Sequence, residues 1–534
     1  MFPYTVNLMN RIKNVNNIVI FFILVLTSIL ISYTYYFDHL ALVNSLILNN
    51  DEIYKDKTSL FYLIFSNQHP SFISFIINFF IKINFSIDFI NLILTFIATL
   101  LNLSGIYLIS KFITSSIFLS ILISTTAILL TKNFGDIDYP TLMFSWHTTG
   151  LFAYSLSTFI LGLLTLRNLL FAFLTCLLLL SIHLVVGLWM FGIIVLTSYF
   201  FIKERNIKKI GFTVFILLIV FLFYINWFAN YAVEIPFEFN QKDYDNYFYY
   251  LEAHRTNYGD LGNLYFDYVV KSLILLTLIL FYLKFSYSNI ENNNNFFFKT
   301  LSISIIFSGI IYFTYKIFPQ IYPEIAVKII PQRFFLIHSV VGYPIIISIF
   351  YKLLERFCVY IKFNKNLAFQ LIAAVIILHI IQQHHVIKIR FDNIKIINED
   401  KIQEHLFWKK VKDLELNGYV LTSNNLCNKT IIYTNFPILF CFHPLDYIPY
   451  FPKLASPTKK ITDKILGISY DELEYKNLSG ISDIEIKKIY ENKNLSEWRI
   501  LKKDLNLNAL IVPNNWNLDL NLILEDRYRV YKIK

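Results

Sequence analysis

Three acidic side chains lie close together in a polar stretch near the start of the chain, where carboxylate chemistry could take place. Asp51, Glu52 and Asp56 follow the first apolar run of the sequence. A carboxylate in such a loop can act as a general base that deprotonates an acceptor group, or it can orient that acceptor. Taken alone, the loop is better explained as a solvated segment in which acidic residues are common. A second group of side chains is therefore needed before a site can be inferred.

A second acidic group occurs in the sequence Gly-Asp-Ile-Asp-Tyr-Pro, which contains Asp136 and Asp138 and is followed by His147. Carboxylate oxygens suit a hard divalent cation such as Mg²⁺ or Mn²⁺, which could bind at Asp136 and Asp138 and stabilise a phosphate leaving group. His147, like Glu52 of the first group, is a candidate for binding substrate. If both groups emerge on one side of a membrane, they could face a single cleft.

Two further ionisable residues lie at the ends of apolar runs. His183 follows Ser181 and Ile182, and an ionisable side chain at membrane depth is a functional candidate. At the end of a helix, however, a histidine can equally cap the helix or lie at the interface. Arg333 opens another apolar run, where it could hold a lipid phosphate through two hydrogen bonds or simply extend its side chain to the interface.

The composition indicates that a membrane positions these residues. Of the 534 residues, 56% are hydrophobic and only 16% are charged, whereas soluble domains carry about 25% charged residues. Runs near the roughly 20 residues needed to cross a bilayer recur, so we expect about eleven transmembrane helices. The runs are Ile18–Tyr36, Phe89–Ser110, Ile113–Leu130, Leu151–Leu166, Leu169–His183, Gly187–Phe201, Ile210–Phe228, Leu264–Phe281, Leu301–Tyr315, Phe335–Phe350 and Ala368–Ile381.

The residues between the runs predict an orientation. Leu60–Lys82 is interrupted by polar residues and Pro70, which predicts two short surface or re-entrant helices instead of one crossing. The basic segments 203–209 and 352–365 then face the cytosol, as the positive-inside rule requires. The acidic loops at 37–60 and 132–149, the loop Ala229–Gly262 and the C-terminal tail face the other side. This shared side would bring both acidic groups to one cleft.

The chain divides into a multi-spanning domain, residues 1–387, and a soluble α/β domain, residues 388–534. Half of the charged residues lie in the second domain, which is long enough to form its own core. We expect a helix at Lys401–Leu414 and strands at Tyr419–Thr422, Ala509–Val512 and Tyr528–Tyr531.

The cysteines and the missing motifs exclude several classes of protein. The four cysteines lack the spacing of a metal site, and Cys427 and Cys441 could pair if the tail lies outside the cytosol. The sequence has no phosphate-binding loop of ATPases, no serine-hydrolase elbow and no zinc-protease motif. The formal charge of +10 is spread over loops and tail and does not form a basic face with stacking aromatics, which argues against nucleic acid as a partner.

The order of these features resembles that of the GT-C superfamily of integral-membrane glycosyltransferases, which includes protein O-mannosyltransferases and lipid A aminoarabinose transferases. The resemblance covers the whole chain as an architecture, although its motifs are short. It depends on the N-terminal anchor, the first loop with Asp51, Glu52 and Asp56, the broken helices around Asn67–Pro70, the second loop with Asp136 and Asp138, the segment Ser181–Trp189, and the soluble tail.

The resemblance implies a GT-C-like α-helical polytopic membrane protein with a C-terminal soluble α/β domain, in the inner membrane of a bacterium. It implies inverting transfer of a sugar from a polyprenyl-phosphate donor to a lipid, glycan or protein acceptor on the periplasmic face. By the same resemblance, Asp51 or Asp56 would be the base or would orient the acceptor, and Asp136 or Asp138 would bind a metal or the acceptor. Arg333 would hold the lipid phosphate.

Two other functions fit the same sequence. A transporter or flippase of a lipid-linked or small solute would also be polytopic, although such proteins often carry ionisable residues at mid-membrane and inverted repeats, and here the acidic groups lie in loops. An inactive GT-C-like protein of the cell envelope is the other alternative. It would have the same architecture with carboxylates that point away from one another.

Overall fold

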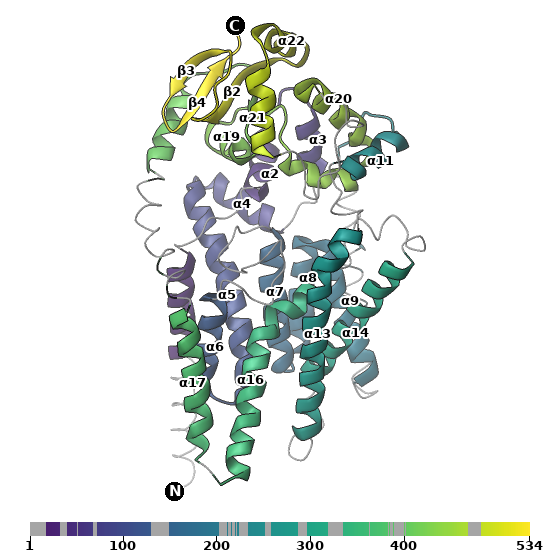
Figure 1. Ribbon diagram of the computed structural model, residues 1–534, viewed down its shortest axis with the longest axis vertical. Helices are drawn as coiled ribbons and strands as arrows, with labels where there is room; N and C mark the ends of the chain where they lie inside the picture. The colour runs from purple at the N-terminus through teal and green to yellow at the C-terminus, as the bar shows by residue number, and fades with distance from the viewer. Residues whose placement is uncertain are drawn as a thin grey trace.

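The protein is a long bundle of helices with a smaller cap at one end, as the computed structural model in Figure 1 shows. The structure describes residues 18–32, 40–50, 52–67, 72–129, 149–201, 233–250, 258–286, 296–318, 335–362, 364–382, 402–467 and 482–534, with a few single residues between these ranges. We use "the cap" for the described residues of 40–67, 233–250 and 402–534.

The bundle consists of apolar helices that follow the apolar runs of the sequence. They are residues 18–32, α5 (Ile87–Thr114), α6 (Ile117–Leu129), α7 (Thr149–Thr165), α8 (Leu169–Ile182), α9 (Leu184–Phe201), α13 (Tyr258–Ser286), α14 (Phe296–Ile317), α16 (Leu336–Tyr360) and α17 (Lys365–Gln382). Their bounds differ from expectation by several residues in places: α5 ends at Thr114, not at Ser110, and α13 begins at Tyr258, not at Leu264.

Three helical stretches among the described residues are long and apolar enough to cross a bilayer: α5, α9 and Phe296–Thr314 of α14. Several shorter apolar helices lie beside them. The run Ile210–Phe228 falls largely outside the described residues, so the expected number of about eleven crossings stays a prediction. Membrane-spanning character is thus supported for part of the bundle.

Several hydroxyl side chains inside the bundle are satisfied within their own helix, which lowers the cost of burying them in an apolar environment. The hydroxyl of Thr95 donates to the carbonyl oxygen of Asn91 at 2.8 Å, and the hydroxyl of Thr197 donates to that of Ile193 at 2.7 Å. Both bonds run back one turn along the same helix, so the hydroxyl needs no partner from another element. Serine and threonine can therefore be buried in these helices at little cost.

Helices α5 and α7 approach each other very closely where both carry a glycine. A Cβ atom added at Gly105 would lie 2.5 Å from the carbonyl oxygen of Thr158, and one added at Gly162 would lie 2.9 Å from the Cα of Gly105. Contact between two helix backbones at small residues is the usual means of packing in lipid, where no hydrophobic effect drives helices together. These two glycines therefore fix the spacing of α5 and α7.

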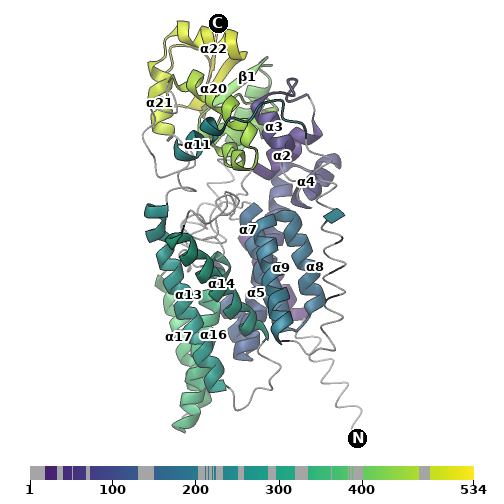
Figure 2. The same cartoon turned by 90° about the vertical axis from the view of Figure 1, so that its right-hand side faces the viewer.

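The first part of the cap comes from the segment between the N-terminal helix and α5. It contains α2 (Leu40–Asn49) and α3 (Leu60–Asn67), while α4 (Phe72–Lys82) lies between the cap and the bundle (Figure 1). The prediction that the run Leu60–Lys82 forms two short helices is confirmed. Figure 2 shows that α11 (Gln241–Tyr250), from a loop much later in the chain, joins the same cap.

The C-terminal part of the cap is a small α/β domain. Its helices are residues 402–412, α19 (Cys427–Thr434), α20 (Ala455–Leu466), α21 (Asp483–Asn492) and α22 (Leu495–Leu505), with 3₁₀ turns η3 (Asn424–Leu426), η4 (His443–Tyr450) and η5 (Pro452–Leu454). Its strands are β1 (Tyr419–Thr422), β2 (Leu507–Pro513), β3 (Asn521–Glu525) and β4 (Tyr528–Lys532). The three expected strands are confirmed, and β3 is additional.

The sheet has the strand order β1-β2-β4-β3, with β1 parallel to β2 and the other pairs antiparallel. Local signals fix several of the elements around it. Ser482 and Asn494 each cap a helix, and the glutamate three residues later bonds back to the capping residue. Gly418 precedes β1 with φ of +94°, and a side chain there would meet the carbonyl oxygen of Asn506 at 2.7 Å.

Candidate functional site

The first acidic loop forms a turn that exposes Asp56 to solvent. Oδ1 of Asp56 accepts hydrogen bonds from the backbone N–H of Thr58 at 2.9 Å and from its hydroxyl at 2.7 Å. These bonds are typical of an aspartate that stabilises its own turn. Oδ2 has no hydrogen-bond partner among the described residues, so one oxygen of this carboxylate is available to a substrate. Glu52 is also exposed, and its backbone N–H donates to the side chain of Asn50 at 3.2 Å.

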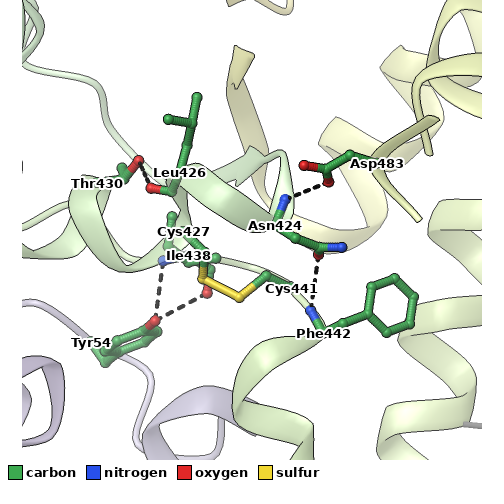
Figure 3. Close-up of a disulfide and its surroundings, with 9 residues drawn as sticks. All are labelled: Tyr54, Asn424, Leu426, Cys427, Thr430, Ile438, Cys441, Phe442 and Asp483. Carbon is green, nitrogen blue, oxygen red and sulfur yellow. Dashed lines mark hydrogen bonds between the residues drawn. A yellow bond between two sulfur atoms is a disulfide. The ribbon is translucent and has the colours of Figure 1, made fainter. Parts of the chain in front are cut away.

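Tyr54 anchors this loop to the C-terminal domain. Its hydroxyl donates to the carbonyl oxygen of Ile438 and accepts from the N–H of the same residue, both at 3.1 Å (Figure 3). The side chain is buried, with 1% of its surface exposed. Burial raises the pKa of Tyr54 well above its ordinary value, so its hydroxyl keeps the proton that it donates.

Ile438, the partner of Tyr54, lies beside β1 at the edge of the sheet. Val420 of β1 donates to the carbonyl oxygen of Pro437 and accepts from the N–H of Leu439, both at 2.9 Å. The N–H and C=O of Ile438 between them therefore point away from β1, toward Tyr54. One phenolic hydroxyl thus satisfies both polar groups that this edge of the sheet leaves unpaired.

A disulfide closes the segment that receives Tyr54. Cys427 and Cys441 are bonded, with a Cα–Cα distance of 6.4 Å and a separation of 14 residues (Figure 3). The pairing that the sequence left open is thus present in the structure. Disulfides persist mainly outside the cytosol, and the side of the membrane on which the tail lies stays a prediction. Cys176 and Cys358 are unpaired and buried.

Asp56 also lies near the start of the sheet. Tyr419 is the first residue of β1, and the centroid of its ring lies 6.4 Å from the centroid of the ring of Tyr54. The pKa of Tyr419 is raised, first by burial and also by the negative charge of Asp56. The carboxylate is therefore held at the junction of the first loop and β1, not on a remote part of the surface.

The loop that carries α11 docks on the same domain. The hydroxyl of Ser456 donates to Oδ2 of Asp243 at 2.6 Å, and Lys459 approaches Oδ1 of Asp243 at 3.6 Å. The buried hydroxyl of Tyr247 donates to the carbonyl oxygen of Leu445 at 2.6 Å. Two loops far apart in the sequence are thus attached to the C-terminal domain at one end of the bundle, as Figure 2 shows.

An open groove of about 510 Å³ lies where this loop meets α20. Its walls combine aromatic rings with amide, hydroxyl and charged groups, a mixture that suits the ring faces and hydroxyls of a sugar. The lining residues are Phe237, Glu238, Phe239, Asn240, Gln241, Ser456, Pro457 and Lys460. This groove is a concave feature of the described part of the cap.

Five of the predicted site residues lie outside the residues that the structure describes. They are Asp51, Asp136, Asp138, His147 and Arg333. Convergence of the two acidic loops on one cleft therefore stays a prediction, as does a metal site at Asp136 and Asp138. Within the described ranges, no group of three or more histidine, cysteine, aspartate or glutamate side chains could hold a metal ion.

His183 lies between two helices of the bundle. It follows the last residue of α8, and the N–H of Val186 in the first turn of α9 approaches its Nδ1 at 3.5 Å. A side chain that accepts from the third residue after it has the geometry of a helix N-cap. Of the two roles that the sequence left open for His183, the geometry favours capping.

Two groups that the structure brings together were not singled out from the sequence. Tyr54 stands among the acidic residues of the first loop, but nothing local indicates a partner 384 residues away. His338, buried near the start of α16, contacts Ser304 of α14. The signal that could have identified it is an ionisable residue within an apolar run.

The chain was also compared with known proteins. No model of a known protein family matches it, and no curated protein matches it significantly.

Proposed function

We propose that the protein is a membrane glycosyltransferase that moves a sugar from a polyprenyl-phosphate donor to a lipid, glycan or protein acceptor at the cap end of the bundle. One observation supports this most strongly. The first acidic loop, with Asp56, is fastened by Tyr54 to a disulfide-closed α/β domain at the end of an apolar helix bundle. A water-soluble acceptor and a membrane-bound donor could meet at such a junction.

In this proposal Asp56 is the carboxylate that acts on the acceptor. Its free Oδ2 takes the proton from an acceptor hydroxyl as that oxygen attacks the anomeric carbon of the donor sugar. A new C–O bond forms on one face of the sugar while the bond to the phosphate oxygen breaks on the other, so the configuration inverts. The electron pair of the broken bond leaves with the lipid phosphate. Asp51, Asp136 and Asp138 remain candidates for the same role or for binding a divalent ion.

The groove beside α20 gives the acceptor a place in this proposal. The exposed ring of Phe239 can stack on a sugar face, and the side chains of Asn240 and Gln241 can hydrogen-bond to hydroxyls. The groove lies in the cap and not among the bundle helices. We therefore assign it to a water-soluble glycan or peptide acceptor, and not to the lipid donor.

The experiment begins with mass spectrometry of envelope glycans and lipid-linked sugars from cells with and without the protein. A polyprenyl-linked sugar that accumulates without the protein identifies the donor, which is then supplied to purified protein in nanodiscs. We expect release of polyprenyl phosphate with the wild type and a loss of about 100-fold or more with Asp56→Asn. Asp413→Asn is the matched control, because Asp413 is an exposed carboxylate of the cap that belongs neither to the first acidic loop nor to the groove.

Two results would contradict the proposal. Full transfer by the Asn variants of Asp51, Asp56, Asp136 and Asp138 would overturn the assignment of the site. Movement of the accumulating lipid across a liposome membrane without any covalent product would identify a flippase, not a transferase.

A further inference from the structure

Three polar side chains meet inside the bundle, away from the cap. They are Trp189 of α9, Ser304 of α14 and His338 of α16. The indole N–H of Trp189 donates to the hydroxyl oxygen of Ser304 at 3.2 Å, and Nε2 of His338 lies 2.6 Å from the same oxygen. His338 has only 1% of its surface exposed. A histidine buried at membrane depth is costly, so its polar contacts need an explanation.

The hydrogen bonds determine which nitrogen of His338 carries its proton. The indole nitrogen can only donate, so the oxygen of Ser304 accepts from Trp189. Among the described residues, the only acceptor bonded to the hydroxyl proton of Ser304 is Nε2 of His338. A charged ring would be expensive in an apolar bundle. The neutral ring that accepts at Nε2 therefore carries its proton on Nδ1.

Within the part of the chain that the structure describes, this Nδ1–H group is a buried donor without a partner. Neither a side chain nor a backbone group among the described residues accepts from it. An unsatisfied buried donor costs on the order of a full hydrogen bond. Trp189 and Ser304 meanwhile hold the ring in one orientation, and the ring of Phe335 packs edge-on against it at 6.3 Å. A donor fixed in this way is prepared to meet an acceptor oxygen that no described residue supplies.

The position of His338 indicates what kind of molecule brings this oxygen. His338 lies in the first turn of α16, whose other end turns into α17 at the side of the bundle remote from the cap (Figure 1). The donor therefore lies within the apolar part of the protein, in the half nearer to the cap. A ligand that enters here must be largely apolar and must carry a hydrogen-bond acceptor.

We propose that Nδ1–H of His338 binds a phosphate oxygen of a lipid-linked substrate, and that Trp189 and Ser304 are positioning residues that set its tautomer. The identification of the ligand as a polyprenyl phosphate depends on the proposed function, whereas the fixed donor does not. A phosphate that enters an apolar bundle needs donors to replace its water, and hydrogen bonds to a charged group are the stronger kind.

Two substitutions of His338 separate this role from a purely structural one. His338→Asn places an amide N–H near the position of Nδ1 but cannot reach Ser304. His338→Gln reaches Ser304 with its longer side chain but has no donor near Nδ1. If Nδ1 binds the phosphate, the Asn variant retains affinity and the Gln variant loses it. If His338 only ties α16 to α14, the order is reversed.

The measurement is binding of decaprenyl monophosphate to the full-length protein in nanodiscs, by native mass spectrometry. Decaprenol and inorganic phosphate are the comparison probes, because they separate the chain from the headgroup. We expect wild-type and His338→Asn protein to prefer the lipid phosphate over decaprenol, and His338→Gln to bind it about 10- to 100-fold more weakly. Ser157→Ala is the control, since it removes a buried hydroxyl that bonds to the carbonyl oxygen of Ala153 within α7.

The outcomes also separate this inference from the proposed function. Binding that depends on Nδ1 in a protein that transfers no sugar would support the site and contradict the transferase. Unchanged binding and transfer in His338→Gln would overturn the site and leave the transferase standing. Equal binding of inorganic phosphate alone would show that the site takes the free ion, and this too would overturn a lipid-linked ligand.

Discussion

Replacement of Tyr54 by phenylalanine tests how the first acidic loop is held. The substitution keeps the buried ring and removes one oxygen, which makes both hydrogen bonds to Ile438. The N–H and C=O of Ile438 would then be left without partners in a buried place. Each such group costs about 1–3 kcal/mol, and part of this is offset because the buried hydroxyl no longer has to lose its water. We expect docking of the loop to weaken by about 2–4 kcal/mol.

Hydrogen exchange followed by mass spectrometry measures this directly. If exchange occurs when the loop opens, 2–4 kcal/mol corresponds to about 30- to 1,000-fold faster exchange at the amide of Ile438. Peptides that cover residues 52–59 should exchange faster as well, whereas those of the bundle should not change. Transfer activity should fall too, because Asp56 depends on the same loop.

Tyr62→Phe is the matched control for this experiment. Tyr62 lies in α3 of the same part of the cap, and its ring contacts the ammonium group of Lys57 at 4.5 Å. No hydrogen bond of its hydroxyl occurs among the described residues, so its loss should change little. Unchanged exchange at Ile438 in Tyr54→Phe, or an equal change in both variants, would refute the reasoning.

Three further outcomes follow from the structure. Gly105→Ala should lower the thermal stability of the purified protein because its Cβ would clash with α7, whereas Gly192→Ala, with no atom within 4 Å, should not. Cys427→Ser should cost about 3 kcal/mol of cap stability in chemical unfolding, since it reopens a 14-residue loop. Hydrogen bonds from Arg527 lower the pKa of Asp400, so the folded state binds fewer protons than the unfolded state. The contact of Asp400 with Arg527 therefore stabilises the folded state fully above the pKa of Asp400 in the unfolded chain, about 3.9, and this stabilisation is lost as the pH falls through the lower pKa of the folded state. Arg527→Gln should therefore make the melting temperature depend less strongly on pH in the acid range.

The helices of the bundle could be predicted because their signal is local. An apolar run of sufficient length has few alternatives to a helix in lipid, since every backbone group must be paired within the segment. The signal for the break between α3 and α4 was also local, because the sequence has a proline between them and proline removes a donor. Residues 521–525 of β3 were missed because they are short, partly exposed and flanked by polar residues. Their pairing with β4 decides their conformation.

The candidate site could be predicted only in part. The sequence identified Asp56 as an exposed carboxylate of the first loop, and the structure agrees. It could not indicate that Tyr54 would pair with Ile438, because such a pairing is set by the packing of the cap and not by neighbours in the chain. His338 was missed for the same reason, since its partner Ser304 comes from another helix.

The discontinuous origin of the cap has a consequence for biogenesis. The bond between Tyr54 and Ile438 joins residues 384 positions apart, and α11 comes from between them. During synthesis, the first loop is made long before the domain that receives it. Closing so long a loop is slow, so this segment must wait unpaired while most of the helices are inserted. Chaperones that protect exposed loops should therefore influence the yield of this protein, and the isolated tail should be a poor substitute for the whole cap.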